Sequence, residues 1–443
     1  MLRRCWTMLK LALPVMISQV SLIIVIFADN IMVGHYSTQA LAASSFVVNT
    51  FNVILMGMMG FSYGLTPLIG MLYAQNKSNE AGRTLKAGLW ANLLVAIAVS
   101  VGLGVFYIYI PKMGQPEELL PLIRPYFLIM LTSLLPIALF NALAQWSYAI
   151  RNTAAPMWIL LGCNLLNIIG NYILIYGKFG APELGLTGAG ISTLIVRILS
   201  AVAIVCMFFF ASRYKSYREG FAAATDSLGS LMKKVTKTSW PVALQMTFET
   251  SAFSACAIMA GWLGTIALAS FQIIVTIGTL GFCIYYSVGT AITILVSNEM
   301  GRGAMNKCRQ VAFDGYAIML MLTGLAIFVF LFFARPIMGI ISDDPVVIEA
   351  AAALIIPLAL YQLGDATQVT FANALRGTSN VMPMLWIAFV SYIIVGLPAS
   401  WLLAFPLGLG NYGITLSFSV SLFLAGALFL TAFLRSTRAK RGK

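Results

Sequence analysis

Long apolar runs separated by short polar segments recur along the whole 443-residue chain. Each run is at least roughly 20 residues long, which is the length that an α-helix needs to cross a bilayer. The runs are continuous, whereas the strands of a membrane β-barrel would show short alternating segments. We therefore predict an all-α integral membrane protein with twelve transmembrane helices, at about residues 11–33, 45–74, 87–110, 123–148, 156–177, 188–211, 239–262, 267–297, 311–334, 348–374, 383–405 and 413–434.

The positions of the basic residues predict how these helices are oriented. The chain carries 27 Lys and Arg and is 9% charged, against about 25% charged residues in a soluble protein. With the N-terminus in the cytoplasm, all but five basic residues fall in predicted cytoplasmic segments; the exceptions are Lys112, Arg124, Lys178, Arg335 and, inside a span, Arg197. This bias follows the positive-inside rule and predicts that both termini are cytoplasmic. It also accounts for the net charge of +13, so no nucleic-acid partner is implied.

The two halves of the chain repeat each other. Residues 14–42 align without a gap on residues 241–269, with Pro14 opposite Pro241. Six predicted spans precede the longest polar interruption and six follow it. An even number of spans gives both halves the same orientation, so we predict two six-helix lobes related by pseudo-two-fold symmetry along the membrane normal. The predicted domains are an N-terminal lobe at 1–211, a cytoplasmic linker at 212–238 and a C-terminal lobe at 239–443.

Three acidic residues lie well inside predicted spans: Asp29, Glu249 and Asp365. A charge at the centre of a membrane helix costs about 2.5–3.5 kcal/mol on insertion scales, so each acid requires a partner or a function. In the repeat, Asp29 aligns with Cys256 and Glu249 with Leu22, so the scaffold accepts apolar residues at these positions. This asymmetry favours a place on an ion pathway over a purely architectural role.

Polar residues accompany Asp29 in the first half. Asp29, Asn171 and Thr193 lie roughly 8–9 Å below the predicted outer ends of their helices, and Asn167 lies one turn deeper. A carboxylate with amide and hydroxyl oxygens suits Na⁺, or a proton held on the acid. For the asparagines and Thr193, hydrogen bonding between helices is an equally open explanation. Arg197 should share the helix face of Thr193 and oppose cation binding there, unless it turns towards lipid or another helix.

The second half has its own acidic pair. Counted from the nearest cytoplasmic basic residues, Glu249 and Asp365 both lie roughly 16–18 Å along their helices, so they could share one level. Gln245 precedes Glu249 by four residues and Tyr361 precedes Asp365 by four, which places each on the helix face of its acid. Either carboxylate cluster could therefore hold Na⁺.

Four stretches contain polar residues in a distinctive order: ALPVMISQVSLIIVIFADNIMVG (12–34), NLLNIIGNYILIYG (164–177), FET (248–250) and YQLGDATQVTFANALRGTSN (361–380). With them the chain resembles the multidrug and toxic compound extrusion (MATE) family, nearest its bacterial NorM-like branch, over essentially its whole length. The resemblance implies two lobes around a central cavity and export by alternating access, coupled to entry of Na⁺ or H⁺. No other cofactor is expected.

The resemblance also implies roles for particular residues. It assigns Asp29 and the three polar residues of the first half to a cation site of the N-terminal lobe. It assigns Glu249, Tyr361 and Asp365 to a site of the C-terminal lobe, which Gln245 joins by its helical position. The expected protein is a monomeric multidrug efflux transporter of the bacterial cytoplasmic membrane, in contact with the lipid bilayer and exporting amphipathic organic cations.

Three other functions remain as alternatives. A flippase for a lipid-linked sugar or another lipid often carries basic residues in its cavity, whereas the deep ionisable residues here are mainly acidic, with Arg197 as the exception. A membrane-embedded enzyme would need a paired catalytic set, and the chain has a single histidine and no HExxH motif, so we predict no enzymatic activity. A channel would not depend on an opposing ion gradient.

Overall fold

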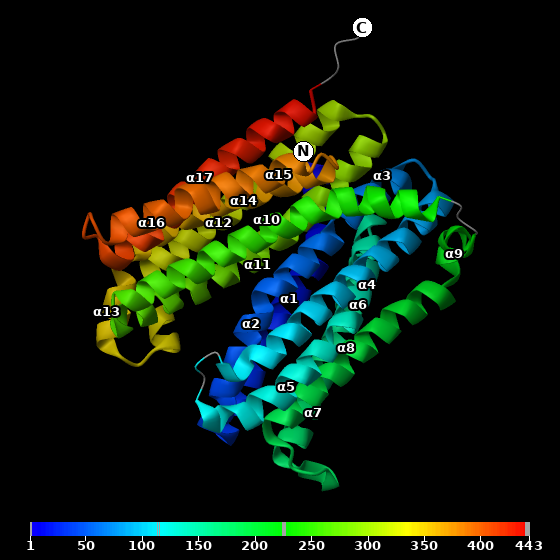
Figure 1. Ribbon diagram of the computed structural model, residues 1–443. Coiled ribbons are helices and arrows are strands. Elements are labelled where there is room, and N and C mark those ends of the chain that lie inside the picture. Colours follow the sequence, from blue (N-terminus) through cyan, green and yellow to red (C-terminus); the bar gives the residue numbers. More distant parts are fainter. Residues whose placement is uncertain (1, 113, 115, 224–226, 439–443) are drawn as a thin grey trace. The chain divides into compact units, whose positions relative to one another are not determined.

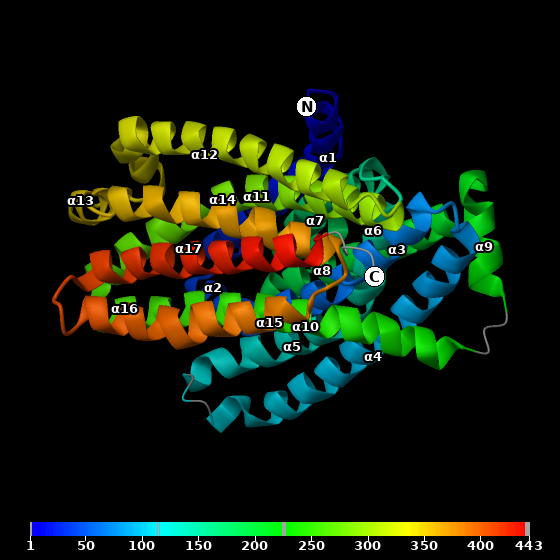
Figure 2. The same ribbon diagram turned by 90° about the horizontal axis from the view of Figure 1, so that it is seen from above.

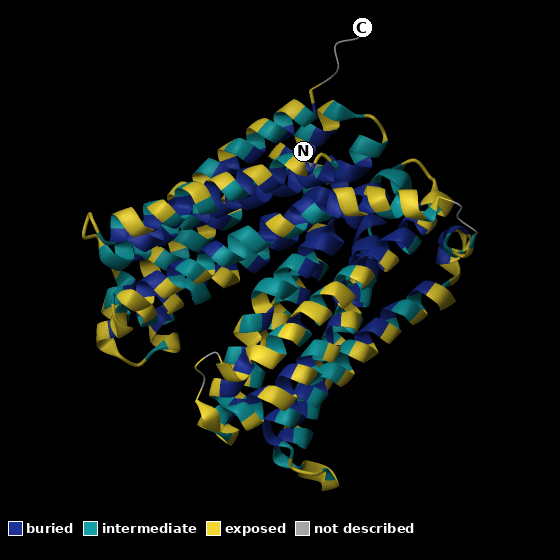
Figure 3. Ribbon diagram, viewed as in Figure 1, coloured by how far each residue is buried: buried dark blue, intermediate teal, exposed yellow. Residues whose placement is uncertain are grey.

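The computed structural model describes residues 2–112, 114, 116–223 and 227–438. Every regular element among these residues is a helix, and they form no strand. The helices bury some of their side chains and expose many large apolar ones, as expected for helices that face lipid (Figure 3). The prediction of an all-α membrane protein is confirmed.

Eleven segments of the described chain are long and apolar enough to cross a membrane. A twelfth is formed if α13 (Pro345–Ala352) and α14 (Ile355–Gly377), which meet at an angle of 53°, are counted as one broken span. Each predicted span thus has a counterpart. The helices are mostly longer than predicted, because their polar and basic ends continue past the apolar stretch from which the spans were inferred.

One compact unit comprises Ile17–Ala243 (Figure 1). Its helix α8 packs against α5, α6 and α7, and α9 packs against α4. The helices that contribute to this unit are α1 (Leu2–Tyr36, from Ile17 on), α2 (Thr38–Tyr63), α3 (Leu65–Ala74), α4 (Ser78–Tyr109), α5 (Leu120–Thr132), α6 (Leu134–Ala149), α7 (Ala154–Tyr176), α8 (Gly185–Phe210), α9 (Lys215–Ala222), the start of α10, and the short turns η1 (Ile110–Lys112), η2 (Glu117–Leu119), η3 (Lys178–Gly180) and η4 (Ser212–Tyr214).

The other unit comprises the residues up to Met16 and those from Leu244 onward. Figure 2 shows α12, α14 and α17 side by side, and α14 also packs against α11, so α14 is enclosed by neighbours. Besides α13 and α14, its helices are α10 (Leu228–Trp262, from Leu244 on), α11 (Thr265–Gly301), α12 (Met305–Ile341), α15 (Met382–Ala388), the π-helical η5 (Phe389–Gly396), α16 (Leu397–Ala404) and α17 (Gly410–Ser436).

The limits of these units differ from the predicted domain limits. The first 16 residues belong to the unit that contains the second half of the chain. The predicted linker 212–238 is largely helical, because it contains α9 and the first turns of α10, which begins at Leu228. Lys and Arg are good helix formers, so a basic segment can extend a helix into water. The basic residues from 440 onward, which contributed to the predicted orientation, lie outside the described residues. The division into two six-helix lobes stays a prediction.

Two breaks in helices shape the first unit. The first break lies between α2 and α3 at Gly64, where an added Cβ would lie 2.3 Å from Ser239 Oγ of α10. Only glycine permits so close an approach. The second break, at Ser133 between α5 and α6, leaves a buried hydroxyl that donates to Met130 O at 2.6 Å.

Candidate functional site

Asp29 and the three polar residues predicted beside it form one chain of contacts in the first unit. Asn171 Nδ2 donates to Asp29 Oδ1 at 2.5 Å and lies 3.4 Å from Asn167 Oδ1. Asn167 Nδ2 in turn lies 3.4 Å from Thr193 Oγ1. Both asparagines are buried, whereas Asp29 and Thr193 are half-buried. The structure therefore joins α1, α7 and α8 through these four side chains.

Small residues allow α7 and α8 to approach closely enough for these contacts. A Cβ added to Gly170 of α7 would lie 2.5 Å from Ser192 Oγ, and one added to Gly188 of α8 would lie 2.5 Å from Leu174 O. Ser192 Oγ donates to the backbone oxygen of Asn167 at 3.1 Å. Close packing of small residues is a common way to associate helices in a membrane.

Arg197 turns towards another helix within the same unit. Its Nη1 donates to Ser133 Oγ at 2.5 Å and lies 3.8 Å from Met130 Sδ. Ser133 is fully buried, so the guanidinium group is directed into the unit and not into lipid. Arg197 also interacts electrostatically with Asp29 and with Tyr126 of α5. The contacts with Ser133 and Met130 had no signal in the sequence, because they depend on how α8 is rotated against α5.

The predicted residues of the second half also lie in one unit. Gln245 Nε2 donates to Glu249 Oε2 at 2.7 Å, and Gln368 Nε2 lies 3.5 Å from the same oxygen. Asp365 is 2% exposed, and its Oδ2 has no hydrogen-bond partner among the described residues. It interacts electrostatically with Glu249. The ring of Tyr361 packs edge-on against Phe253 and Phe418, with centroids 6.2 Å apart in each pair.

A small cavity opens beside Glu249. It is lined from α10, α11 and α14 by Gln245, Met246, Glu249, Phe282, Tyr286, Gln368, Val369, Ala372, Asn373 and Arg376. Arg376 Nη1 donates to Asn373 Oδ1 at 3.1 Å, and the charge of Arg376 acts on Glu249. The sequence predicts Arg376 only as a basic residue of a cytoplasmic segment, whereas in the structure it is 6% exposed and lines this cavity. The spacing of Asp365, Gln368 and Arg376 along one helix face was a signal that could have revealed it.

Tyr392 is a further residue of this region that sequence reasoning missed. It lies in the π-helical segment η5, is almost fully buried, and interacts electrostatically with Glu249 and Asp365. Segments of π-helix are rare and are often found at functional sites. No sequence pattern that we considered indicates where such a segment forms.

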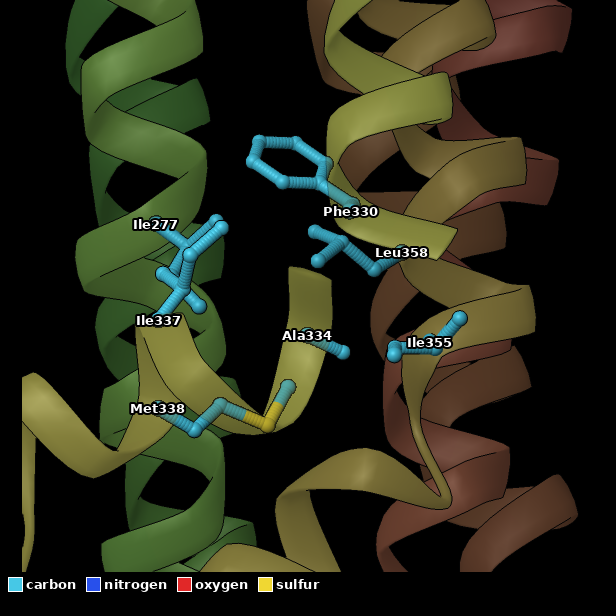
Figure 4. A pocket seen from close by; sticks show the side chains of 7 residues that line it. All are labelled: Ile277, Phe330, Ala334, Ile337, Met338, Ile355 and Leu358. Atoms are coloured by element: carbon cyan, nitrogen blue, oxygen red, sulfur yellow. The ribbon is translucent and has the colours of Figure 1, made fainter. Parts of the chain in front are cut away.

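A second pocket of the same unit is purely apolar. Its lining residues come from α11, α12 and α14, and Figure 4 shows their side chains: Ile277, Phe330, Ala334, Ile337, Met338, Ile355 and Leu358. Helix α12 is kinked here at Phe333 (φ −121°, ψ 20°), three residues before Pro336. Without a polar group, this pocket offers nothing to hold an ion.

The described residues offer little for metal-dependent or nucleophilic catalysis. They contain no group of three or more His, Cys, Asp or Glu that could hold a metal ion. Residues 60–64 spell the GxSxG pattern of some hydrolases, but Ser62 is buried and donates to Asn92 Oδ1 at 2.7 Å. It also lies in helix α2, whereas the hydrolase motif requires a strand-to-helix turn. Any cation at the two acidic clusters would need amide, hydroxyl or water oxygens as further ligands.

Sequence comparison decides the family. The model of the MatE family matches residues 14–173 and 241–402, which include Asp29 and Glu249. The chain belongs to the MATE family of multidrug efflux transporters. A probable multidrug resistance protein NorM of Oceanobacillus iheyensis is 31% identical to this MATE chain over 95% of the chain and 94% of that protein. The multidrug resistance protein MdtK of Yersinia pestis is 30% identical over 92% of the chain and 88% of that protein.

Solved structures show the same fold as this MATE protein. A eukaryotic MATE transporter, AtDTX14, matches with a TM-score of 0.88 and 19% identity, over 99% of the chain and 98% of that structure. The Vibrio cholerae MATE transporter VcmN in its bent form matches with a TM-score of 0.87 and 16% identity, over 99% and 98%. These comparisons confirm the predicted family, its NorM-like branch and the fold. The roles of the site residues stay predictions.

Proposed function

We propose that this MATE protein exports amphipathic organic cations in exchange for Na⁺ or H⁺ through alternating access. Asp365 carries the proposal: it is buried inside a membrane helix, and one of its carboxylate oxygens has no partner among the described residues. A buried carboxylate in this state is costly unless it binds something. A coupling cation or the positive charge of a drug would satisfy it.

Competition for the same carboxylates would couple the two fluxes. When the transport path faces the cytoplasm, aromatic side chains and ionised acids hold the lipophilic cation. After the path opens outward, Na⁺ or H⁺ neutralises the acids and the drug leaves. This coupling requires the drug and the ion to prefer different states, because equal affinity for the two states would shift nothing. The amide partners of Asp29 and Glu249 support this proposal, because they hold both carboxylates in defined positions.

The same proposal includes the cellular setting. The protein would act as a monomer in the cytoplasmic membrane of a bacterium, with both termini in the cytoplasm. The bacterial relatives and the distribution of basic residues support this placement. Its only cofactor would be the coupling ion, and its substrates would be small organic cations.

Export from proteoliposomes tests the proposal. Ethidium movement would be measured first with an imposed Na⁺ gradient and then with a pH gradient. We expect one of the two to drive export by the wild type, and Asp365→Asn and Glu249→Gln to reduce it strongly. Glu349→Gln, which alters an exposed acid paired with Arg335, serves as the control. Export at the wild-type rate by both Asp365→Asn and Glu249→Gln would rule the proposal out.

One observation favours a lipid flippase as the second candidate. Arg376 lines the cavity beside Glu249, and a guanidinium group is a common partner of phosphate oxygens. Deleting the gene would then cause a cell-wall or capsule defect and leave drug sensitivity unchanged. Increased sensitivity to cationic drugs with a normal envelope would favour drug export.

A further inference from the structure

We propose that Arg197 is a specificity-determining residue that excludes metal cations from Asp29, so that the cluster of Asp29, Asn167, Asn171 and Thr193 does not bind Na⁺. The inference rests on the proposed function and deepens it, because it leaves the Glu249 and Asp365 cluster as the place where Na⁺ could couple to export.

The charge of Arg197 is not neutralised by the groups that it contacts. Its guanidinium donates to the hydroxyl of Ser133 at 2.5 Å and lies 3.8 Å from the thioether of Met130, and both partners are neutral. Among the described residues, none of the ion pairs with N–O distances up to 4.0 Å includes Arg197. Arginine stays protonated in proteins, so this side chain carries a permanent positive charge into the unit.

That charge acts on the acid of the cluster. Arg197 lies one helical turn after Thr193 on α8, and it interacts electrostatically with Asp29. Ser133, at the break between α5 and α6, fixes the direction of the guanidinium. A metal cation bound to Asp29 would be repelled by a charge that cannot leave or lose its proton.

The amide groups of the cluster would not exclude a cation by themselves. Asn171 presents an N–H group to Asp29, and an N–H group cannot coordinate a metal. Its Oδ1 is buried without a hydrogen-bond partner among the described residues, so a turn of the amide would offer that oxygen to a cation. The fixed charge of Arg197 is therefore the excluding element.

The balance of charges differs between the two clusters. In the first, the single carboxylate of Asp29 is opposed by the single guanidinium of Arg197, so the local charge is about zero. In the second, Glu249 and Asp365 interact with each other, and Arg376 acts on Glu249, so carboxyl groups outnumber guanidinium groups by two to one. Only the second cluster has more carboxyl groups than guanidinium groups, so only there can a monovalent metal ion replace a proton without facing an equal fixed positive charge.

Binding of ²²Na⁺ to the purified full-length protein tests the inference. The background variant Glu249→Gln/Asp365→Asn removes the second cluster, and we expect it to bind no Na⁺ saturably. Adding Arg197→Gln should create saturable binding with an affinity at least about tenfold above the detection limit set by the background variant, because a repulsion of about 1.4 kcal/mol or more is removed. Adding Asp29→Asn as well should abolish that binding. Arg197→Lys in the background should bind none, because it keeps the charge.

A second variant tests the same point with Arg197 in place. Asn171→Asp in the background adds a carboxylate beside Asp29 and makes the cluster net negative, so Na⁺ binding should also appear. Gel filtration and helical circular dichroism would confirm that each variant is folded. If Arg197→Gln does not fold, Asn171→Asp decides the question.

Two results would overturn the inference. One is Na⁺ binding by the background variant that Asp29→Asn removes, because Arg197 would then exclude nothing. The other is that neither Arg197→Gln nor Asn171→Asp, in the background variant and correctly folded, binds Na⁺. Neither result depends on transport, whereas failure of the wild type to export ethidium would refute the proposed function and leave the binding data unaffected.

Discussion

Asn171 on α7 donates a 2.5 Å hydrogen bond to the carboxylate of Asp29 on α1. The donor is fully buried, and the acceptor is one of the three acids that lie well inside predicted spans. Asn164 of α7 reaches the same partner helix, where it donates to Ser21 Oγ at 2.8 Å. The first contact involves an acidic group, and the second joins two neutral groups. Comparing the two therefore distinguishes a role of the Asp29 carboxyl group from a purely structural link between α1 and α7.

We expect Asn171→Leu to reduce ethidium export about tenfold or more, because loss of a hydrogen bond to a charged group costs about 1.5–3 kcal/mol. The matched control Asn164→Leu removes an α1–α7 hydrogen bond without touching Asp29, and it should retain most of the activity. Initial export rates in proteoliposomes would be compared at equal protein content. Equal losses in the two variants would mean that the Asn171 contact is only structural.

The two glutamines beside Glu249 should affect ion binding in the order of their distances from Glu249 Oε2. Gln245→Leu removes a 2.7 Å hydrogen bond and should lower the apparent affinity for the coupling ion more than Gln368→Leu, whose contact measures 3.5 Å. Gln272→Leu changes an exposed glutamine of α11 and serves as the control. The measurement is the ion concentration that gives half-maximal export. The reverse order would contradict the assigned contacts.

Substitution by asparagine should have opposite effects on export and stability at Asp365 and at Asp314. Asp365→Asn replaces a buried carboxyl group, one oxygen of which has no partner among the described residues, by a neutral amide, so we expect an unchanged or higher Tm together with loss of export. Asp314→Asn weakens the 2.6 Å ion pair with half-exposed Arg4 and should cost about 1 kcal/mol of stability while export continues. Thermal unfolding in detergent and export in proteoliposomes would both be recorded. A lower Tm for Asp365→Asn would show that its charge stabilises the fold.

Two glycines of α4 predict opposite effects on stability. A Cβ at Gly82 would lie 2.0 Å from the backbone oxygen of Tyr217 in α9, whereas a Cβ at Gly102 would meet nothing within 4 Å. Gly82→Ala should therefore lower the unfolding free energy by about 1–3 kcal/mol through overpacking. Gly102→Ala should raise it by up to about 1 kcal/mol, because alanine is the better helix former. Comparable Tm values for the two variants would show that α9 is not held against α4.

The residues of the two clusters could be selected from the sequence, but most of their partners could not. Asp29, Glu249 and Asp365 stand out because a charge in an apolar run is costly wherever the helix packs. Gln368 lies one turn from Asp365 and could have been found by the same count. The contact between Arg197 and Ser133 has no such signal, because it depends on the rotation of one helix against another.

The sequence by itself determined the class of protein, the approximate spans, the predicted orientation and the family, because each depends on local hydrophobicity, on charge or on ordered motifs. Only the tertiary structure decided that α13 and α14 form a bent pair, that Tyr392 lies in a π-helical segment and that Arg376 faces a cavity. These features arise from packing between helices far apart in the chain. Lipid is as apolar as the side chains it surrounds, so hydrophobicity places a helix in the membrane, and close packing with polar contacts then selects its neighbours.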